Sequence, residues 1–141
     1  MYFKPLLLPL LAQVALTFVV TSTMYRKRIA EMKTKRIHPQ SVDTRANSTN
    51  ALTDSASASD NLTNLFEFPV LFYTAILLTL VLMVQDMVIV ALSWTYVMSR
   101  WTHSFIHITY NRVMHRFVVF IFSSLVLFAL WTRLGWIIVQ S

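Results

Sequence analysis

Residues 68–99, FPVLFYTAILLTLVLMVQDMVIVALSWTYVMS, decide how this chain folds. The stretch is apolar except at Gln85 and Asp86. An α-helix rises about 1.5 Å per residue and the hydrocarbon core of a bilayer is roughly 30 Å thick, so the stretch is too long for one crossing. It therefore predicts two membrane helices joined by a tight hairpin at Gln85–Asp86, formed without glycine or proline.

The composition also indicates a membrane protein. Of the 141 residues, 56% are hydrophobic and 13% are charged, and a soluble domain of this length needs more surface charge. Apolar blocks about as long as a bilayer is thick predict an all-α fold, a four-transmembrane-helix bundle in a single membrane domain over residues 1–141. The first span is interpreted as a retained helix, since no small-residue cleavage pattern precedes its basic end. The expected helices cover about 5–24, 61–84, 87–109 and 113–139, with a polar loop over about 25–60.

The distribution of Lys and Arg predicts the orientation. Seven of the twelve lie between Arg26 and Arg45, and three more lie around the join of the third and fourth helices: Arg100, Arg112 and Arg116. By the positive-inside rule both polar loops are cytoplasmic, and the two termini and the hairpin are periplasmic, in a bacterial inner membrane. This topology explains the net charge of +6, so the expected partner is the lipid bilayer and no nucleic acid.

The long polar loop has two parts. Residues 25–38, YRKRIAEMKTKRIH, continue the first helix as a basic segment that is expected to lie along anionic headgroups. Residues 46–61, ANSTNALTDSASASDN, have the composition of a flexible loop. The chain has no cysteine, so any thiol chemistry has to use a thiol from a substrate.

Polar residues lie on one face of the third predicted helix. Arg100, His103, His107 and Tyr110 follow a spacing of three, four and three residues, which places them on the same face. Charged groups inside a membrane face the bundle interior or a wet cavity and pair with another group. If the hairpin turns at residues 85–86, Glu67 lies level with Ser104 and one step from His103, so Glu67 is the expected partner of Arg100 from the neighbouring helix.

The segment around Glu67 allows two interpretations. Asn64 and Glu67 fit an N-cap pair, and Pro69 fits the first residue of a helix. A helix from Pro69 to Val84 is however only about 24 Å long, which is short for a span. The second helix is therefore expected to start nearer Asn61 and to bend at Pro69.

The two histidines also allow two interpretations. His103 and His107 have a spacing that can hold a metal or a haem. Since the chain lacks cysteine and a second carboxylate-rich helix, histidines at the membrane interface fit better, and no metal is predicted. The whole polar face fits either a structural ion-pair layer or a site for a polar ligand.

Two stretches carry a resemblance to a known family. NLFEFPVLFY at residues 64–73 and YVMSRWTHSFIHITYNRVMHRF at residues 96–117 resemble the MAPEG family in a bacterial-type form. These are the membrane-associated proteins in eicosanoid and glutathione metabolism. The resemblance covers all four predicted spans, and it implies a four-helix protomer, a homotrimer, and glutathione held between neighbouring subunits at the cytoplasmic side.

The resemblance also implies roles for individual residues. Asn64 and Glu67 match glutathione-binding positions, with Glu67 on the amino group, and His103 and His107 stand where some members carry tyrosines. The implied glutathione-binding residues are Asn64, Glu67, Arg100, His103, His107 and Tyr110. The implied catalytic residues, which would stabilise the thiolate, are Arg112, Arg116 or Arg26. The chain departs from the family at Phe68, where members carry tyrosine, and it has no arginine shortly before Asn64.

Three functions remain open at this point. The first is a glutathione-dependent transferase or peroxidase acting on lipophilic electrophiles that enter from the bilayer. The second is a non-catalytic structural or accessory subunit of a larger membrane protein complex, with Arg100 and Glu67 serving only packing. The third is a metal or haem carrier that uses His103 and His107.

Overall fold

The computed structural model describes residues 4–140, and this part of the chain is helical without any strand. The longer helices are α1 (Leu7–Thr34), α5 (Met87–Ile108) and α6 (Val113–Gln140). Between α1 and α5 the order is η2 (Pro39–Val42), α2 (Arg45–Ala51), α3 (Ala56–Leu65) and α4 (Phe68–Val81), and a short 3₁₀ turn, η1 (Lys4–Leu6), precedes α1.

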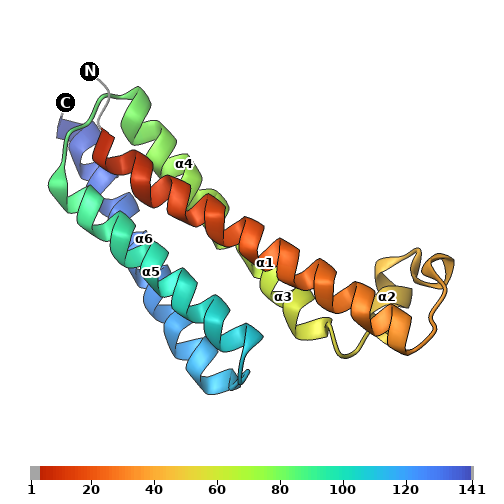
Figure 1. Cartoon of the computed structure of the whole chain (residues 1–141). Coiled ribbons are helices and arrows are strands. Elements are labelled where there is room, and N and C mark those ends of the chain that lie inside the picture. Colours follow the sequence, from red (N-terminus) through yellow and green to blue (C-terminus); the bar gives the residue numbers. More distant parts are fainter. Residues whose placement is uncertain (1–3, 141) are drawn as a thin grey trace.

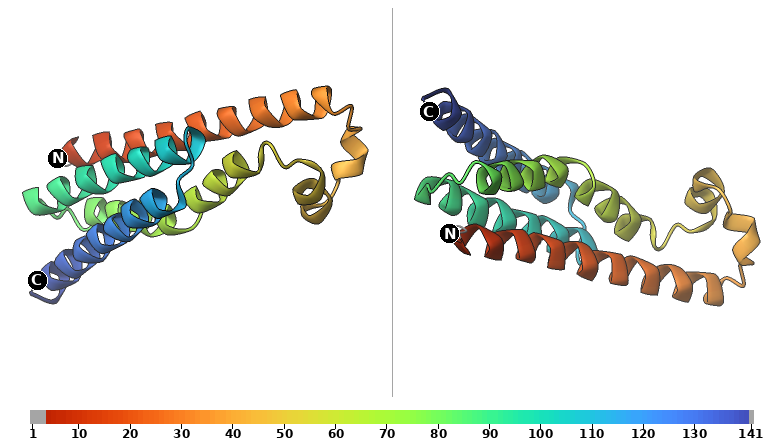
Figure 2. Two further views of the ribbon diagram at one scale, coloured as in Figure 1. Left: turned by 90° about the horizontal axis from the view of Figure 1, so that it is seen from below. Right: turned by 90° about the horizontal axis from the view of Figure 1, so that it is seen from above.

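The long helices form an elongated bundle (Figure 1). α5 and α6 pack along each other, α1 contacts α3 and α5, and α6 also contacts α4. Both ends of the described chain lie at the same end of the bundle as the turn between α4 and α5, while α2 lies at the opposite end, beside the last turns of α1 (Figures 1 and 2). Because both ends of the described chain lie at the same end of the bundle, the chain runs along the bundle an even number of times.

Three helical segments in residues 4–140 are long and apolar enough to cross a membrane. They are Lys4–Thr34, Ala56–Val81 and Val113–Gln140. α5 is 22 residues long, but it carries the polar face and does not meet the same measure of hydrophobicity. The chain is thus an all-helical protein with three candidate spans, and the crossing by α5 stays a prediction.

The first helix is longer than the predicted span 5–24. α1 continues to Thr34, so the basic segment extends the helix, as its sequence indicated. The helix measures 28 residues, more than one crossing needs, and its last turns lie beyond the part that packs on α5 (Figure 2).

The prediction of a flexible loop over residues 46–61 is wrong. Most of this segment is helical, in α2 and the start of α3. Thr44 caps α2 by accepting a hydrogen bond from the Asn47 backbone N–H, and Leu52 and Ala58 are buried. The polar composition of this segment wrongly predicted a loop. One cap and a few apolar side chains are sufficient to form these helices, because α3 packs on the long neighbouring helix α1.

The second predicted span begins before its proline, as expected, but it is interrupted there rather than bent. It starts at Ala56 rather than near Asn61, α3 ends at Leu65, and α4 resumes at Phe68 with Pro69 in its first turn. A proline has no N–H, and its ring clashes with the carbonyl four residues earlier, here that of Leu65. The helix therefore cannot continue unbroken through residues 65–69.

The hairpin predicted at Gln85–Asp86 is confirmed, because α4 ends at Val81 and α5 begins at Met87. Met83 takes a left-handed conformation (φ 53°) in place of a glycine. Asp86 then caps α5: its Oδ1 accepts from the Ile89 N–H at 3.0 Å, and its Oδ2 accepts from Arg133 Nη2 on α6 at 2.6 Å. One carboxylate thus ties the turn, α5 and α6 together.

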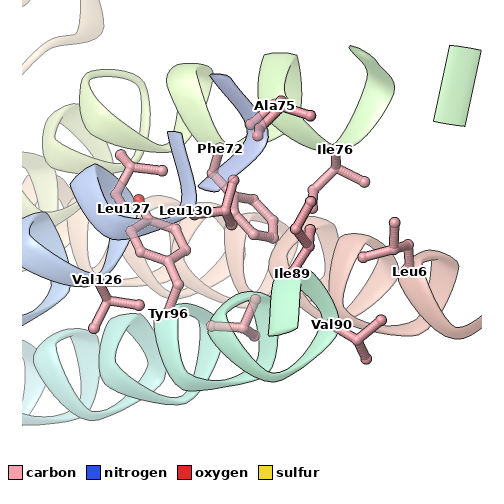
Figure 3. Packing of buried hydrophobic residues seen from close by; sticks show 12 residues of the cluster. Leu6, Phe72, Ala75, Ile76, Ile89, Val90, Tyr96, Val126, Leu127 and Leu130 are labelled. Carbon is pink, nitrogen blue, oxygen red and sulfur yellow. The ribbon is translucent and has the colours of Figure 1, made fainter. Parts of the chain in front are cut away.

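The core lies between α4, α5 and α6 near this hairpin (Figure 3). Tyr96 stacks on Phe72, with ring centroids 4.8 Å apart, and Leu127 and Leu130 of α6 are buried in the same cluster. Lipid tails are as apolar as these side chains, so close packing rather than removal from water stabilises such a core. The outer faces of the helices carry many exposed apolar side chains, as expected for contact with lipid.

The polar end of α1 holds the start of α3. Glu31 is 5% exposed, and its carboxylate accepts from the backbone N–H groups of Asp54 (2.9 Å) and Ser55 (2.8 Å) and from the Ser55 hydroxyl (2.7 Å). Lys35 Nζ donates to the same carboxylate at 2.6 Å, and this bond raises the pKa of Lys35, although partial burial opposes the rise. Glu31 thereby occupies the N-terminus of α3, where a negative charge is favourable.

Replacing Asp86 should weaken the hairpin end of the bundle. For Asp86→Ala we expect the free energy of unfolding to fall by about 1–2 kcal/mol, mostly through the lost cap, since Arg133 is partly exposed and its pair is screened. Arg133→Gln keeps the cap and should lose less than about 1 kcal/mol. Denaturant titration in detergent micelles measures both, and equal losses would contradict this division.

The same carboxylate gives stability a pH dependence. Burial raises the pKa of Asp86, but Arg133 and the Ile89 N–H outweigh it, so the pKa is lowered below its ordinary value. The resulting stability is present above the unfolded pKa of about 4 and is lost as the pH falls through the lower folded value. Asp86→Ala should therefore flatten the stability curve below about pH 4 relative to the wild type.

Removing Glu31 should release the start of α3. For Glu31→Ala we expect amide hydrogen exchange in residues 53–60 to rise on the order of 10-fold or more, because hydrogen bonds to a charged group contribute about 1.5–3 kcal/mol. Asp54→Ala is the matched control, since it removes an exposed carboxylate and leaves the backbone donors in place. Equal exchange in the two variants would show that Glu31 does not hold the segment.

Candidate functional site

The polar face of α5 points into the bundle. Arg100 is fully buried, and His103, Ser104 and His107 are at most 3% exposed. The Arg100 guanidinium donates from Nη2 to the Asn64 carbonyl oxygen at 3.4 Å, and its Cζ lies 5.9 Å from the centre of the Phe120 ring. Within residues 4–140, Arg100 Nε and Nη1 have no hydrogen-bond partner. The Nε and Nη1 of this buried guanidinium are therefore hydrogen-bond donors without an acceptor in the described chain.

The expected ion pair between Arg100 and Glu67 does not form. Glu67 is exposed, and the ion pairs of the described chain are those of Lys35 and Arg133 with their carboxylates. The prediction assumed one continuous helix, in which Asn64 and Glu67 would share a face. Glu67 instead lies after the end of α3, with φ −94° and ψ −95°. Because the helix is broken before Pro69, the side chains of Glu67 and Asn64 do not share one helix face.

His103 and His107 both contact Arg116 at the start of α6, in different ways. His103 Nδ1 lies 3.2 Å from the Arg116 carbonyl oxygen, whereas Arg116 Nη1 donates to His107 Nε2 at 2.8 Å. The same Nη1 donates to Asn111 Oδ1 at 2.7 Å. No group of three or more His, Cys, Asp or Glu side chains in the described chain is placed to hold a metal ion around these rings.

A small pocket lies where the end of α3 meets α5 and α6. Its volume is about 230 Å³, and its polar lining is Asn64, His103 and Arg116. The apolar lining is Val113, Phe117 and Phe120. The Cζ of Arg100 lies 5.9 Å from the centre of the Phe120 ring, so the buried guanidinium is close to this wall of the pocket without lining it. Pockets for whole small ligands measure about 300–1,000 Å³, so this one suits part of a ligand.

Comparison with known proteins settles the family. The sequence model of the MAPEG family matches residues 6–136. This chain belongs to the MAPEG family. No curated protein and no solved structure matches it. Together with the apolar helices, this membership makes the chain an integral membrane MAPEG-family protein.

The pocket of this MAPEG protein contains only some of the predicted site residues. Asn64, His103 and Arg116 line it, while Arg100 contacts Phe120 of the lining and His107 contacts Arg116. The remaining ones are exposed elsewhere: Arg26 on α1, Arg112 and Tyr110 around the turn before α6, and Glu67 at the helix break. Tyr110 contacts His115 rather than the histidines of the α5 face.

Three residues of the site were not among the predicted ones. Phe120 forms a wall, and its position one helical turn after Arg116 is the signal that would have found it. Asn61 and Ser104 join α3 to α5 by a hydrogen bond of 3.1 Å from the hydroxyl to the amide oxygen. Both are almost completely buried, so this bond fixes α3 against the helix that carries Arg100 and His103.

Breaking the bond between Asn61 and Ser104 should destabilise the site region. Ser104→Ala leaves the Asn61 amide oxygen buried without a donor, which costs about 1–3 kcal/mol of unfolding free energy. The double variant Ser104→Ala/Asn61→Leu removes both polar groups and should recover most of this loss. Thermal unfolding in detergent measures the wild type, Ser104→Ala, Asn61→Leu and the double variant. Additive losses in the double variant would contradict a coupled pair.

Proposed function

We propose that this MAPEG-family protein binds glutathione and transfers it to lipophilic electrophiles that enter from the bilayer. The observation that carries the proposal is a pocket lined by Asn64, His103 and Arg116. Next to its Phe120 wall lies the fully buried Arg100, whose Nε and Nη1 find no acceptor within residues 4–140. A buried charge without acceptors is costly, and an anionic ligand would supply them.

Glutathione fits the chemistry of this site. It carries two carboxylates and a thiol. One guanidinium group (Arg116) and one histidine (His103) line the pocket, and the guanidinium of Arg100 lies next to its Phe120 wall. The volume of about 230 Å³ is small for the whole tripeptide, so the pocket would take one part of it, with the rest lying across the outer surface. Glu67 is exposed at the helix break nearby and is free of any ion pair in the described chain, which suits its predicted role on the amino group.

A second hollow suits the lipophilic substrate. It measures about 520 Å³, lies between α5 and α6, and is lined mainly by apolar side chains, among them Trp94, Met98 and Phe122. Two of its lining residues, Thr102 and Val119, directly precede His103 and Phe120 in the chain. Consecutive residues of a helix point roughly 100° apart, so this hollow lies on a neighbouring face of the same helix pair, where an apolar electrophile dissolved in the bilayer would enter.

The proposed reaction is addition to an activated alkene. The thiol loses its proton, the thiolate sulfur forms a bond with the electrophilic carbon, and the π electron pair moves to the neighbouring carbons. The resulting anion then takes up one proton, so that the product is the sum of thiol and alkene. A nearby cation favours the thiolate, and cations are present at this site in Arg100 and Arg116.

The proposal includes the assembly and the orientation. We propose a homotrimer, with the outer part of each glutathione site completed by a neighbouring copy. In a bacterial inner membrane the basic end of α1 would face the cytoplasm and both termini the periplasm, as the positive-inside rule predicts. The pocket near the turn between α5 and α6 would then open at the cytoplasmic side, where glutathione is plentiful.

A non-catalytic subunit of a larger membrane complex is the second candidate. Its support is the engagement of Arg116, whose Nη1 already donates to His107 and Asn111 and so is less available to a thiolate. Phe68, where family members carry tyrosine, points the same way. A chain of this kind would keep the fold and its buried polar face without binding glutathione.

Titration calorimetry with glutathione separates the two. We expect the detergent-solubilised protein to bind glutathione, and Arg116→Gln to weaken the affinity about 10-fold or more, because a hydrogen bond to a charged group contributes about 1.5–3 kcal/mol. Arg45→Gln removes the same charge from an exposed position on α2 and should leave the affinity unchanged. No heat at millimolar glutathione, together with copurification in a stoichiometric complex, would favour the accessory subunit.

A further inference from the structure

A second polar pocket lies at the basic end of α1, and it shares no residue with the pocket lined by Asn64, His103 and Arg116. Its volume is about 420 Å³, and α1, α2 and α3 all contribute to its walls. The charged members of its lining are Arg28, Asp43, Arg45 and Asp60. Pockets for small ligands measure about 300–1,000 Å³, so this one is large enough for a whole polar group.

This pocket lies at the level where the apolar part of α1 ends. On α1 its lining runs from Met24, the last residue before the basic segment, to Arg28, about 6 Å further along. Tyr25 between them is exposed, and tyrosine is enriched where hydrocarbon meets headgroups. Lys27 Nζ donates to the Ile108 carbonyl oxygen at 3.4 Å, so α5 ends at the same level. A phospholipid headgroup would therefore lie beside this pocket.

Opposite charges line the pocket without pairing. Arg45 on α2 and Asp60 on α3 are both exposed, and within residues 4–140 neither side chain forms a hydrogen bond or an ion pair. Arg28 on α1 donates from Nη2 to the Ser48 hydroxyl, and a guanidinium has five N–H donors, so most of its donors remain. Donors and an acceptor that line one accessible pocket are thus open to a ligand that bridges them.

The balance of charge favours a zwitterionic ligand over a simple anion. Two arginines and two aspartates line the pocket, so an anion alone would be attracted by one pair and repelled by the other. Asp43 already accepts from Asn47 Nδ2 at 2.9 Å, which leaves Asp60 as the free carboxylate. Guanidinium groups suit phosphate oxygens, and a carboxylate suits the N–H donors of an ammonium group. Met24 and Leu62 add apolar surface to the same lining.

We propose that this pocket binds the phosphoethanolamine headgroup of a membrane phospholipid. The phosphate oxygens accept from Arg28 and Arg45, and the ammonium group donates to Asp60. Met24 and Leu62 contact the glycerol end of the lipid. Because the three charged residues belong to α1, α2 and α3, one headgroup would hold α2 against the end of the bundle, where Figure 1 shows it beside the last turns of α1. This inference goes beyond the proposed function and does not depend on it.

Native mass spectrometry of the intact chain tests the choice of lipid. Delipidated protein in detergent is mixed with phosphatidylethanolamine, phosphatidylcholine or phosphatidylglycerol of the same acyl chains. We expect the ethanolamine lipid to bind about 10-fold more tightly or better, because choline has no N–H to donate to Asp60 and the glycerol headgroup has no cation. Equal affinity for the three lipids overturns the proposal. Free phosphoethanolamine that binds as tightly as the lipid overturns the membrane as its source.

Two variants locate the site. Arg45→Gln removes a phosphate contact and should weaken the ethanolamine lipid about 10-fold, and Asp60→Asn should abolish its advantage over the choline lipid. Lys33→Gln is the matched control, since it removes an exposed charge of α1 outside the pocket. Amide hydrogen exchange in α2 should slow when the ethanolamine lipid is added to the wild type, and much less in Asp60→Asn. Variants that behave like Lys33→Gln in both measurements overturn the proposal.

Calorimetric titration with glutathione keeps this inference apart from the proposed function. We expect Asp60→Asn to bind glutathione as the wild type does, because Asp60 lies outside the pocket proposed for glutathione. A loss of glutathione affinity in this variant would assign the second pocket to glutathione and overturn the lipid. A wild type that selects the ethanolamine lipid but binds no glutathione would overturn the proposed function while this inference stands.

Discussion

The break between α3 and α4 is the constraint on which the rest of this structure depends. Pro69 cannot donate a hydrogen bond, and its ring excludes the Leu65 carbonyl from a helical position, so the second span is divided within its length. Interrupted backbone inside a membrane is tolerated only where protein or a wet cavity covers it. Here the polar face of α5 covers it, and the Asn64 carbonyl oxygen accepts from Arg100. The site therefore exists where the helix is broken.

The same arrangement explains how a buried arginine is kept in an apolar bundle. Arg100 gains one backbone acceptor and the face of Phe120, which is less than a guanidinium with five N–H donors can use. A membrane-protein core that depends on close packing has little to gain from such a residue. Arg100 lies beside the unpartnered Nε2 of His103 and next to the Phe120 wall of the pocket in which we propose that glutathione binds.

Much of the fold could be predicted because it depends on local patterns. The apolar blocks, the hairpin at Gln85–Asp86 and the early start of the second span all follow from length, hydrophobicity and one proline, and the structure has them. The polar face of α5 was also predictable from spacing, since Arg100, His103 and His107 are all buried on it. The start of α3 within residues 46–61 was not, because it depends on Glu31, a residue far away in the sequence.

The sequence by itself determined that this chain is a helical membrane protein, which face of α5 is polar, and where the second span departs from a straight helix. These are properties of single segments, and side-chain periodicity and backbone chemistry decide them. Only the tertiary structure decided the partners. It turned Glu67 outward and Asn64 toward Arg100, placed the Arg116 carbonyl on His103 Nδ1, and closed the pocket with Phe120. Such contacts depend on how a broken helix is rotated against its neighbours, and the spacing of residues along one helix carries no record of that rotation.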